Sequence, residues 1–270
     1  MPLLNATQLS GGLGGYLGEA ASGEQLFLVA RNTVLFGCTH SVLEALLPQL
    51  LSYKTLASLK AGDMHELALQ SNSMLHASVV SVMALYALLS GGAFVEDKLF
   101  GSSELVSFIF ALSVGYFVWD LLLLLRSDKR EVVYVFHHLC GIVVYSIARW
   151  PFLQYSALAC LLYELSTPFL CMRSILLTLG LKGSRRLLLV ERVFAVSFVL
   201  CRILFGLPVS LQGILLGGRA ALEGRLPYVS HYLIILAANC IINGLNLFWL
   251  SKIYKMAVKG GSGSAKAKAS

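Results

Sequence analysis

Long uninterrupted apolar runs are the feature of this 270-residue sequence that most restricts its fold. Seven segments contain about 20 residues or more, enough for a helix to cross roughly 30 Å of hydrocarbon. Leu, Ala and Gly dominate these segments and apolar residues do not alternate with polar ones, so the pattern favours helices over barrel strands. We therefore expect an all-α, polytopic membrane bundle of about seven transmembrane helices. The segments are residues 25–46, 72–91, 104–125, 132–150, 152–179, 187–216 and 229–254.

The composition and the placement of positive charge agree with this expectation. Only 13% of the residues are charged and 57% are hydrophobic, which is too few charges for a water-soluble surface. Lys and Arg collect in cytoplasmic loops, and the loops after segments one, three and five, together with the tail, hold 13 of them against four on the other side. This predicts a cytosolic C-terminus, and it explains the net charge of +7 without a nucleic-acid partner. The 13 are Lys54, Lys60, Arg126, Lys129, Arg130, Lys182, Arg185, Arg186, Lys252, Lys255, Lys259, Lys266 and Lys268, and the four are Lys98, Arg149, Arg219 and Arg225.

The domain organisation follows from the segments. We expect a lumenal N-terminal segment at 1–24, a first transmembrane helix with its cytosolic loop at 25–71, a six-helix domain at 72–257 and a flexible basic tail at 258–270. The six cysteines lie in the apolar segments without ligand-like spacing, so we expect neither a disulfide framework nor a metal site.

The C-terminal tail carries a candidate sorting signal. Its last five residues, KAKAS, fit the KxKxx pattern by which cytosolic coat proteins return membrane proteins to the endoplasmic reticulum. The preceding Gly-Gly-Ser-Gly-Ser stretch is also typical of an engineered linker, and the sequence leaves both interpretations open. With the first interpretation, we expect residence in the endoplasmic reticulum.

Ionisable side chains inside the apolar segments need partners, because each unpaired charge costs at least about 2.5 to 3.5 kcal/mol at the bilayer centre. Asp120, His137 and Arg173 each lie about 8 to 9 Å from the cytosolic end of their segments, and His76 is slightly shallower. We therefore expect these four residues, from four helices, to share one layer.

A second group of polar residues lies near the midplane. Glu164 and Arg202 are expected to form an ion pair there. Asn239, Asn243 and Asn246 follow at i, i+4 and i+7, so they share one helix face that should point inward. Pro168 removes the hydrogen bond to the carbonyl of Glu164, and it is expected to kink the helix beside this carboxylate. Pro208 is expected to bend the next segment past Arg202.

These residues resemble a known family. An Asp late in one segment, a short charged loop, an adjacent His pair early in the next and an acidic residue before Ser/Thr-Pro are similar to the TLC domain. The matching stretches read FVWDLLLLLRSDKREVVYVFHHLCGIVVYSIARW and LLYELSTPFLCMR. The resemblance covers about residues 70–255 and is closest to the small TLC-domain-containing proteins.

The resemblance implies candidate roles. Ceramide synthases are the enzymes of this family, and they transfer a fatty acyl group from acyl-CoA to a sphingoid base with a His pair and a later His-Asp. His137 and His138 match the pair, whereas Tyr163 and Glu164 stand in place of His-Asp. Most of the accompanying acids are also replaced, which weakens the enzyme interpretation.

Helix geometry limits what the pair can do. Adjacent helix residues point about 100° apart, so one imidazole should face the bundle while the other bonds a neighbouring helix. The sequence does not say which. The inward one, held by Asp120, is a candidate general base or nucleophile.

Two functional hypotheses follow. The first is a protein of lipid metabolism or homeostasis that binds a membrane lipid or fatty acyl chain in a polar-floored cavity. The second is an acyltransferase that uses acyl-CoA as co-substrate, with His137, His138 and Asp120 as catalytic residues. In either case the candidate substrate-binding residues are His76, Arg173, Glu164, Arg202, Asn239, Asn243 and Asn246. A membrane scaffold or trafficking factor is a weaker third hypothesis. The structural alternative is that these polar residues only form hydrogen bonds between helices.

Overall fold

The computed structural model describes residues 23–127 and 131–268, with side chains for residues 23, 26–127 and 131–255. Segment 1–22 and the side chains of the KxKxx tail therefore lie outside the part that can be compared with expectation. In the described part the chain is helical without a strand, which confirms the all-α membrane bundle. The elements are α2 (Gly23–Leu50), α3 (Tyr53–Ser58), α4 (Asp63–Ser90), α5 (Ala93–Glu96), α6 (Glu104–Arg126), α7 (Val132–Ala148), α8 (Gln154–Leu161), η1 (Leu162–Ser166), α9 (Thr167–Thr178), α10 (Arg185–Phe198), η2 (Val199–Phe205), α11 (Gly206–Leu222) and α12 (Val229–Lys268).

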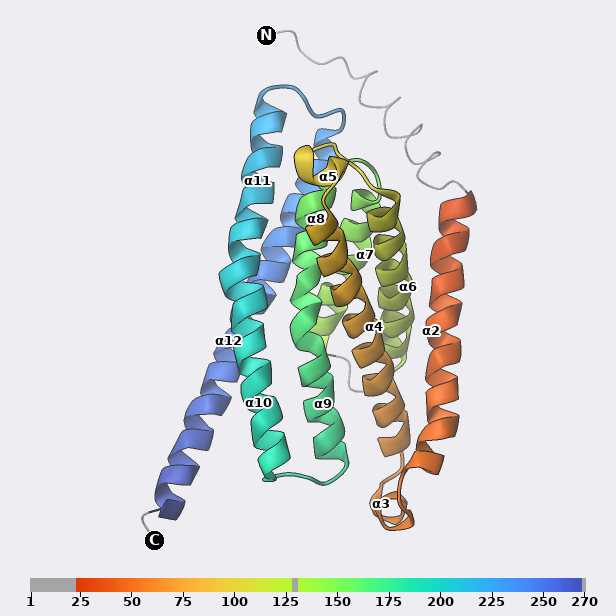
Figure 1. The fold of residues 1–270 in the computed structure, drawn as a ribbon, viewed down its shortest axis with the longest axis vertical. Helices are drawn as coiled ribbons and strands as arrows, with labels where there is room; N and C mark the ends of the chain where they lie inside the picture. The colour runs from red at the N-terminus through yellow and green to blue at the C-terminus, as the bar shows by residue number, and fades with distance from the viewer. Residues whose placement is uncertain (1–22, 128–130, 269–270) are drawn as a thin grey trace.

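In the described residues the helices form seven rods (Figure 1). They are α2, α4, α6, α7, a fifth rod made of α8, η1 and α9, a sixth made of α10, η2 and α11, and α12. Six of the rods in the described chain are long and apolar enough to cross a membrane. The seventh, α7, has 17 residues, or about 25 Å of helix. It packs between α6 and α12 inside the bundle, so the seven predicted segments each correspond to one rod.

The connections alternate between the two ends of the bundle. Helix α3 and the α9–α10 turn lie at one end with the end of α12, whereas α5 and the α11–α12 connection lie at the other (Figure 1). The loops that hold most of the positive charge therefore share one end, as the charge pattern predicted. Gly180 and Gly183 adopt positive φ of 74° and 79° in the α9–α10 turn, which other residues rarely adopt.

The fifth rod changes its helix type beside Pro168, where the sequence predicted a kink. Pro168 has no N–H to donate to the Glu164 carbonyl, and the N–H of Thr167 donates to it in its place. This i to i+3 bond produces the 3₁₀ stretch η1 between α8 and α9. The sixth rod contains a π-helical stretch, η2, which ends at Phe205, three residues before Pro208. Glu164 lies in η1 and Arg202 in η2, so both charges occupy irregular segments.

The largest of three apolar clusters in the described residues holds α4, α6, α7 and α8 together. Phe110, Ile109, Leu158 and Leu161 are fully buried at its centre. Helix α2 packs on the side of this core, against α4 and α6. It approaches α6 closely because Gly115 faces Asn32, where a Cβ would lie 2.4 Å from the Asn32 Cβ.

Candidate functional site

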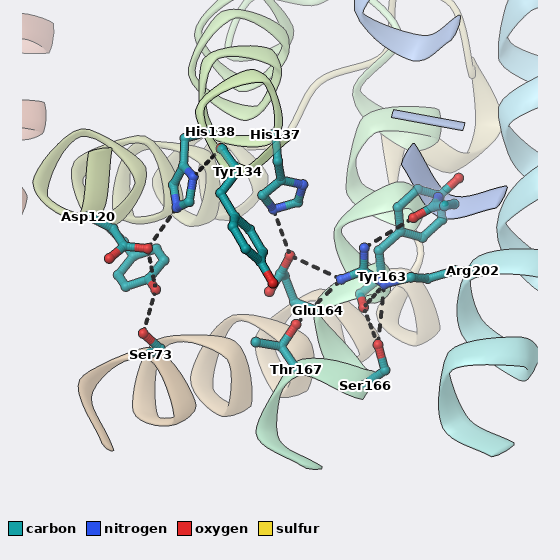
Figure 2. A network of polar contacts seen from close by, with 12 residues as sticks. Ser73, Asp120, Tyr134, His137, His138, Tyr163, Glu164, Ser166, Thr167 and Arg202 are labelled. Atoms are coloured by element: carbon teal, nitrogen blue, oxygen red, sulfur yellow. Dashed lines mark hydrogen bonds and ion pairs between the residues drawn. The ribbon is translucent and has the colours of Figure 1, made fainter. Parts of the chain in front are cut away.

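The two adjacent histidines of α7 point in different directions, as helix geometry requires. Their ring centroids are 5.4 Å apart and the ring planes are perpendicular, at 90°. His138 turns toward α6, and His137 turns toward η1 (Figure 2). Each histidine therefore has its own set of contacts.

His138 is fixed by hydrogen bonds at both ring nitrogens. Its Nδ1–H donates to the Tyr134 carbonyl at 2.6 Å, and its Nε2 lies 2.7 Å from Asp120 Oδ2. Since Nδ1 must carry a hydrogen, Nε2 and the Asp120 carboxylate hold one proton between them. The Tyr116 hydroxyl lies 3.2 Å from the same oxygen and 2.8 Å from Ser73 Oγ, which continues the chain of contacts to α4 (Figure 2).

This arrangement corrects the expected role of Asp120. We expected Asp120 to hold the inward-facing histidine, but it holds the one bonded to its neighbouring helix. The inward-facing histidine is His137, whose Nε2 lies 3.8 Å from Glu164 Oε1. Its Nδ1 is buried and has no hydrogen-bond partner among the described residues.

The expected Glu164–Arg202 pair is present, and Arg202 is held by much more than this pair. Its Nη2 is 3.8 Å from Glu164 Oε1, and the other contacts of the guanidinium engage all three of its nitrogens. The rings of Phe198, Tyr163 and Trp249 surround the guanidinium at 5.4 to 5.8 Å. Arg202 therefore connects η1, η2 and α12, and each of its three side-chain nitrogens contacts a protein acceptor. The acceptors are the Tyr163 carbonyl and Ser166 Oγ, both at 3.2 Å, Asn246 Oδ1 at 3.1 Å and Thr167 Oγ1 at 3.4 Å.

A cavity lies between α7, α8, α11 and α12, next to His137. Its empty volume is about 870 Å³, including space that opens to the outside. Most of the lining is apolar and includes Tyr145, Ala157, Ile235 and Leu236. Close approach of small residues contributes to the shape: a Cβ on Gly213 would lie 2.9 Å from Ser156 Oγ across the cavity wall.

Besides single polar residues such as Ser156, two groups of polar side chains reach this cavity. His137 and Glu164 form one of them. The other is a hydrogen-bonded cluster of Ser210, Asn239 and Asn243: Asn243 Nδ2 donates to Ser210 Oγ at 2.6 Å and to Asn239 Oδ1 at 2.7 Å. Ser210 also donates to Asn239, and the Tyr163 hydroxyl donates to Asn243 at 3.5 Å.

The structure thus divides the predicted site residues into two groups. His137, Glu164, Asn239 and Asn243 line the cavity, and the remaining candidates lie behind its wall or elsewhere. Asn246 is fully buried, but it points at Arg202. The Asn face does point inward, as predicted, although only two of its three members reach the cavity.

Of the four residues expected in one layer, which include His76, three make their ion pairs outside this group: Asp120 with His138, His137 with Glu164 and Arg173 with Glu191. Arg173 donates to Glu191 at 3.0 Å, and its ion pair among the described residues is with this α10 carboxylate, not with Asp120. His76 is fully buried and stacks on Tyr116 with ring centroids 3.8 Å apart. His76 and His137 both contact the Phe117 ring, at 5.6 and 5.9 Å between ring centroids, so Arg173 is the member of the four that turns to a different set of neighbours.

Sequence reasoning missed two residues of the site. Tyr116 supports Asp120 from one helical turn earlier, a spacing of four residues that was visible in the sequence. Ser210 completes the polar cluster of the cavity, but it lies two residues after Pro208 in a segment where the π-helical stretch changes the facing of every following residue.

Comparisons with known proteins bear on the family. The TLC domain model matches residues 66–255. TLC domain-containing protein 4-B of Danio rerio is 29% identical over 252 residues, which cover 90% of this chain and 92% of that protein. An uncharacterised TLC domain-containing protein of Schizosaccharomyces pombe is 31% identical over 185 residues, which cover 65% of this chain and 60% of that protein, so the chain spans less than two thirds of this relative. Because the family model matches well over half of the residues, the chain belongs to the TLC domain family.

Proposed function

We propose that this TLC-domain membrane protein acts in lipid metabolism or homeostasis by binding one lipid or fatty acyl chain in the cavity beside His137. The supporting observation is the cavity itself, whose lining is mostly apolar and includes two groups of polar side chains, His137 with Glu164 and the Ser210 cluster. The cavity is concave, mostly apolar and lined from several helices, which is typical of small-molecule sites in helix bundles. An amphipathic ligand suits such a lining, because its chain contacts the apolar wall while its polar group meets the buried donors and acceptors.

The simplest test fills the cavity with a side chain. Ala238 lines the cavity and is 6% exposed, whereas its neighbour Ala237 points outward. We expect the Ala238→Phe variant, purified in mild detergent, to lose most of the lipid that copurifies with the wild-type protein. The Ala237→Phe variant adds the same ring to the outer surface and should retain the lipid. The measurement is mass spectrometry of extracted lipid per mole of protein.

Size-exclusion profiles and thermal unfolding of both variants separate lipid loss from misfolding. If Ala238→Phe is folded and still carries the wild-type amount of the same lipid, the cavity is not the binding site. Equal loss in both variants would also contradict the proposal, because the outward ring does not enter the cavity.

Acyl transfer is the second candidate function, and the geometry of His137 favours it specifically. Glu164 faces Nε2, while Nδ1 is buried and has no hydrogen-bond partner in the described residues, so its lone pair is not engaged by a protein donor. In the first step this nitrogen would attack the thioester carbonyl of acyl-CoA. The C–S bond would break, coenzyme A would leave as the thiol after taking up the imidazole proton, and the acyl group would remain on the ring. An amine or hydroxyl acceptor would then take the acyl group and restore the histidine.

This candidate makes a residue-specific prediction. After incubation with an acyl-CoA, mass spectrometry of the wild-type protein should find an acyl group on the peptide that contains His137. The adduct should be absent in His137→Ala and present in His138→Ala variants that remain folded. Whole lipid without an adduct, under conditions where acyl-CoA is in excess, would leave lipid binding as the function and exclude this chemistry for the acyl-CoAs used.

A further inference from the structure

Three potential metal-ligating side chains converge at the α3 end of the bundle, away from the cavity. His40 and Glu44 lie one turn apart on α2, and His65 lies in the first turn of α4. His40 Nε2 is 3.2 Å from His65 Nδ1, and His65 Nδ1 is 2.8 Å from Glu44 Oε1. Glu44 Oε2 is 3.8 Å from His40 Nε2. Within the part of the chain that the structure describes, this is the only group of three such residues whose ligand atoms meet.

The separations match those of ligands around one tetrahedral metal ion. Metal–nitrogen and metal–oxygen bonds of about 2.0 to 2.1 Å at tetrahedral angles place neighbouring ligand atoms roughly 3.3 Å apart. The observed separations of 2.8, 3.2 and 3.8 Å lie on both sides of this value. The 2.8 Å separation involves Oε1 of Glu44 and the 3.8 Å separation involves Oε2, so either oxygen of this carboxylate lies close to the two imidazole nitrogens.

Hydrogen bonding alone satisfies the cluster poorly. His65 Nδ1 faces both an imidazole nitrogen and a carboxylate oxygen, and it has at most one hydrogen to share between them. A cation at the centre would instead accept a lone pair from each of the three side chains.

The surroundings provide both a rigid wall and an entry path. His40 is 6% exposed and its ring lies 5.4 Å from that of Trp119 on α6. The side chains of Glu44 and His65 are 40% and 52% exposed, so an ion can reach the site from outside the bundle. All three residues precede residue 66, where the match to the TLC domain begins.

We propose that His40, Glu44 and His65 bind a divalent transition-metal ion of the zinc type. Two imidazoles and one carboxylate are a ligand set that suits Zn²⁺, and three protein ligands leave a fourth position for water. The ion would link α2 to α4, and thereby attach the helix that precedes the matched domain to the domain itself.

The test measures zinc uptake by full-length protein purified without a polyhistidine tag. After incubation with Zn²⁺ and removal of free metal, we expect about one zinc ion per wild-type chain by elemental mass spectrometry. His65→Ala and Glu44→Gln change exposed side chains, so they should fold normally but bind zinc at least roughly 100-fold more weakly, because even changes outside the ligand shell cost about 10- to 100-fold. His231→Ala, which removes a histidine far along the chain on α12, should bind zinc as the wild type does.

Cobalt provides an independent spectroscopic readout. Co²⁺ in place of zinc should give the intense visible bands of a four-coordinate site in the wild type and in His231→Ala, and weak bands in His65→Ala. Wild-type protein that takes up no zinc would overturn the proposal. So would uptake that His65→Ala and Glu44→Gln leave unchanged, since the metal would then be bound elsewhere.

Discussion

At the scale of single residues, helix geometry predicts that the adjacent histidines diverge, but it does not predict which of them faces the cavity. The offset of about 100° between neighbours predicts that they diverge, and they do. Which of them faces the cavity depends on the rotation of α7 against α6 and η1, and that rotation is set by packing such as the contact of Phe117 with both imidazole rings. No pattern within α7 itself contains this information.

The different partners of the two histidines can be measured as coupling free energies. We expect a double-mutant cycle between His138 and Asp120 to give about 1.5 to 3 kcal/mol, the range for hydrogen bonds to charged groups. The cycle between His137 and Asp120 should give less than about 0.5 kcal/mol, since they share no contact. Equilibrium unfolding of Ala variants in mixed micelles provides the free energies. A larger coupling for His137 than for His138 would mean that the assignment of Asp120 is wrong.

At the scale of elements, the two broken rods place the buried charges. Pro168 was sufficient to predict an irregular helix beside Glu164, because a proline has no N–H to donate to the carbonyl four residues earlier. The π-helical stretch around Arg202 was not predictable in the same way. It lets Arg202 reach the Tyr163 carbonyl, Ser166 and Asn246 together, and these contacts come from segments distant in sequence.

Helix α2 supplies a prediction about element packing. A Cβ on Gly115 would collide with Asn32, and the Gly115 carbonyl accepts a hydrogen bond from Thr33 at 3.1 Å. Gly115→Ala should therefore push α2 from α6 and reduce the free energy of unfolding by about 1 to 3 kcal/mol, as overpacking typically does. Gly244→Ala is the matched control, because a Cβ there meets nothing within 4 Å. Thermal unfolding in detergent measures both, and equal stability of the two variants would contradict the close approach.

At the scale of the whole molecule, the sequence predicted the number of rods and the end of the bundle at which each connection lies. Apolar length and charge placement suffice for this because the membrane imposes them on each segment separately. Pairing between helices is different. Arg173 and Glu164 both needed partners by burial, yet depth alone assigned Glu164 to Arg202 correctly and grouped Arg173 with the wrong residues. Depth is encoded in sequence position, whereas the rotation of each helix depends on all its neighbours.

The orientation of the bundle in the membrane follows from the charge at its two ends. We expect the end with α3 and the α9–α10 turn to face the cytosol, because Lys182, Arg185 and Arg186 gather there. A flexible insert carrying an Asn-X-Thr glycosylation acceptor after Gly224 should therefore be glycosylated in cells, and the same insert after Gly183 should not. Both glycines are exposed in turns with positive φ, so the inserts disturb no helix. A shift in gel mobility that endoglycosidase H reverses reports glycosylation in the endoplasmic reticulum. Modification after Gly183 alone would mean that the bundle has the opposite orientation. Modification at both sites would place the two turns on the same side of the membrane, and the rod between them would then not cross it.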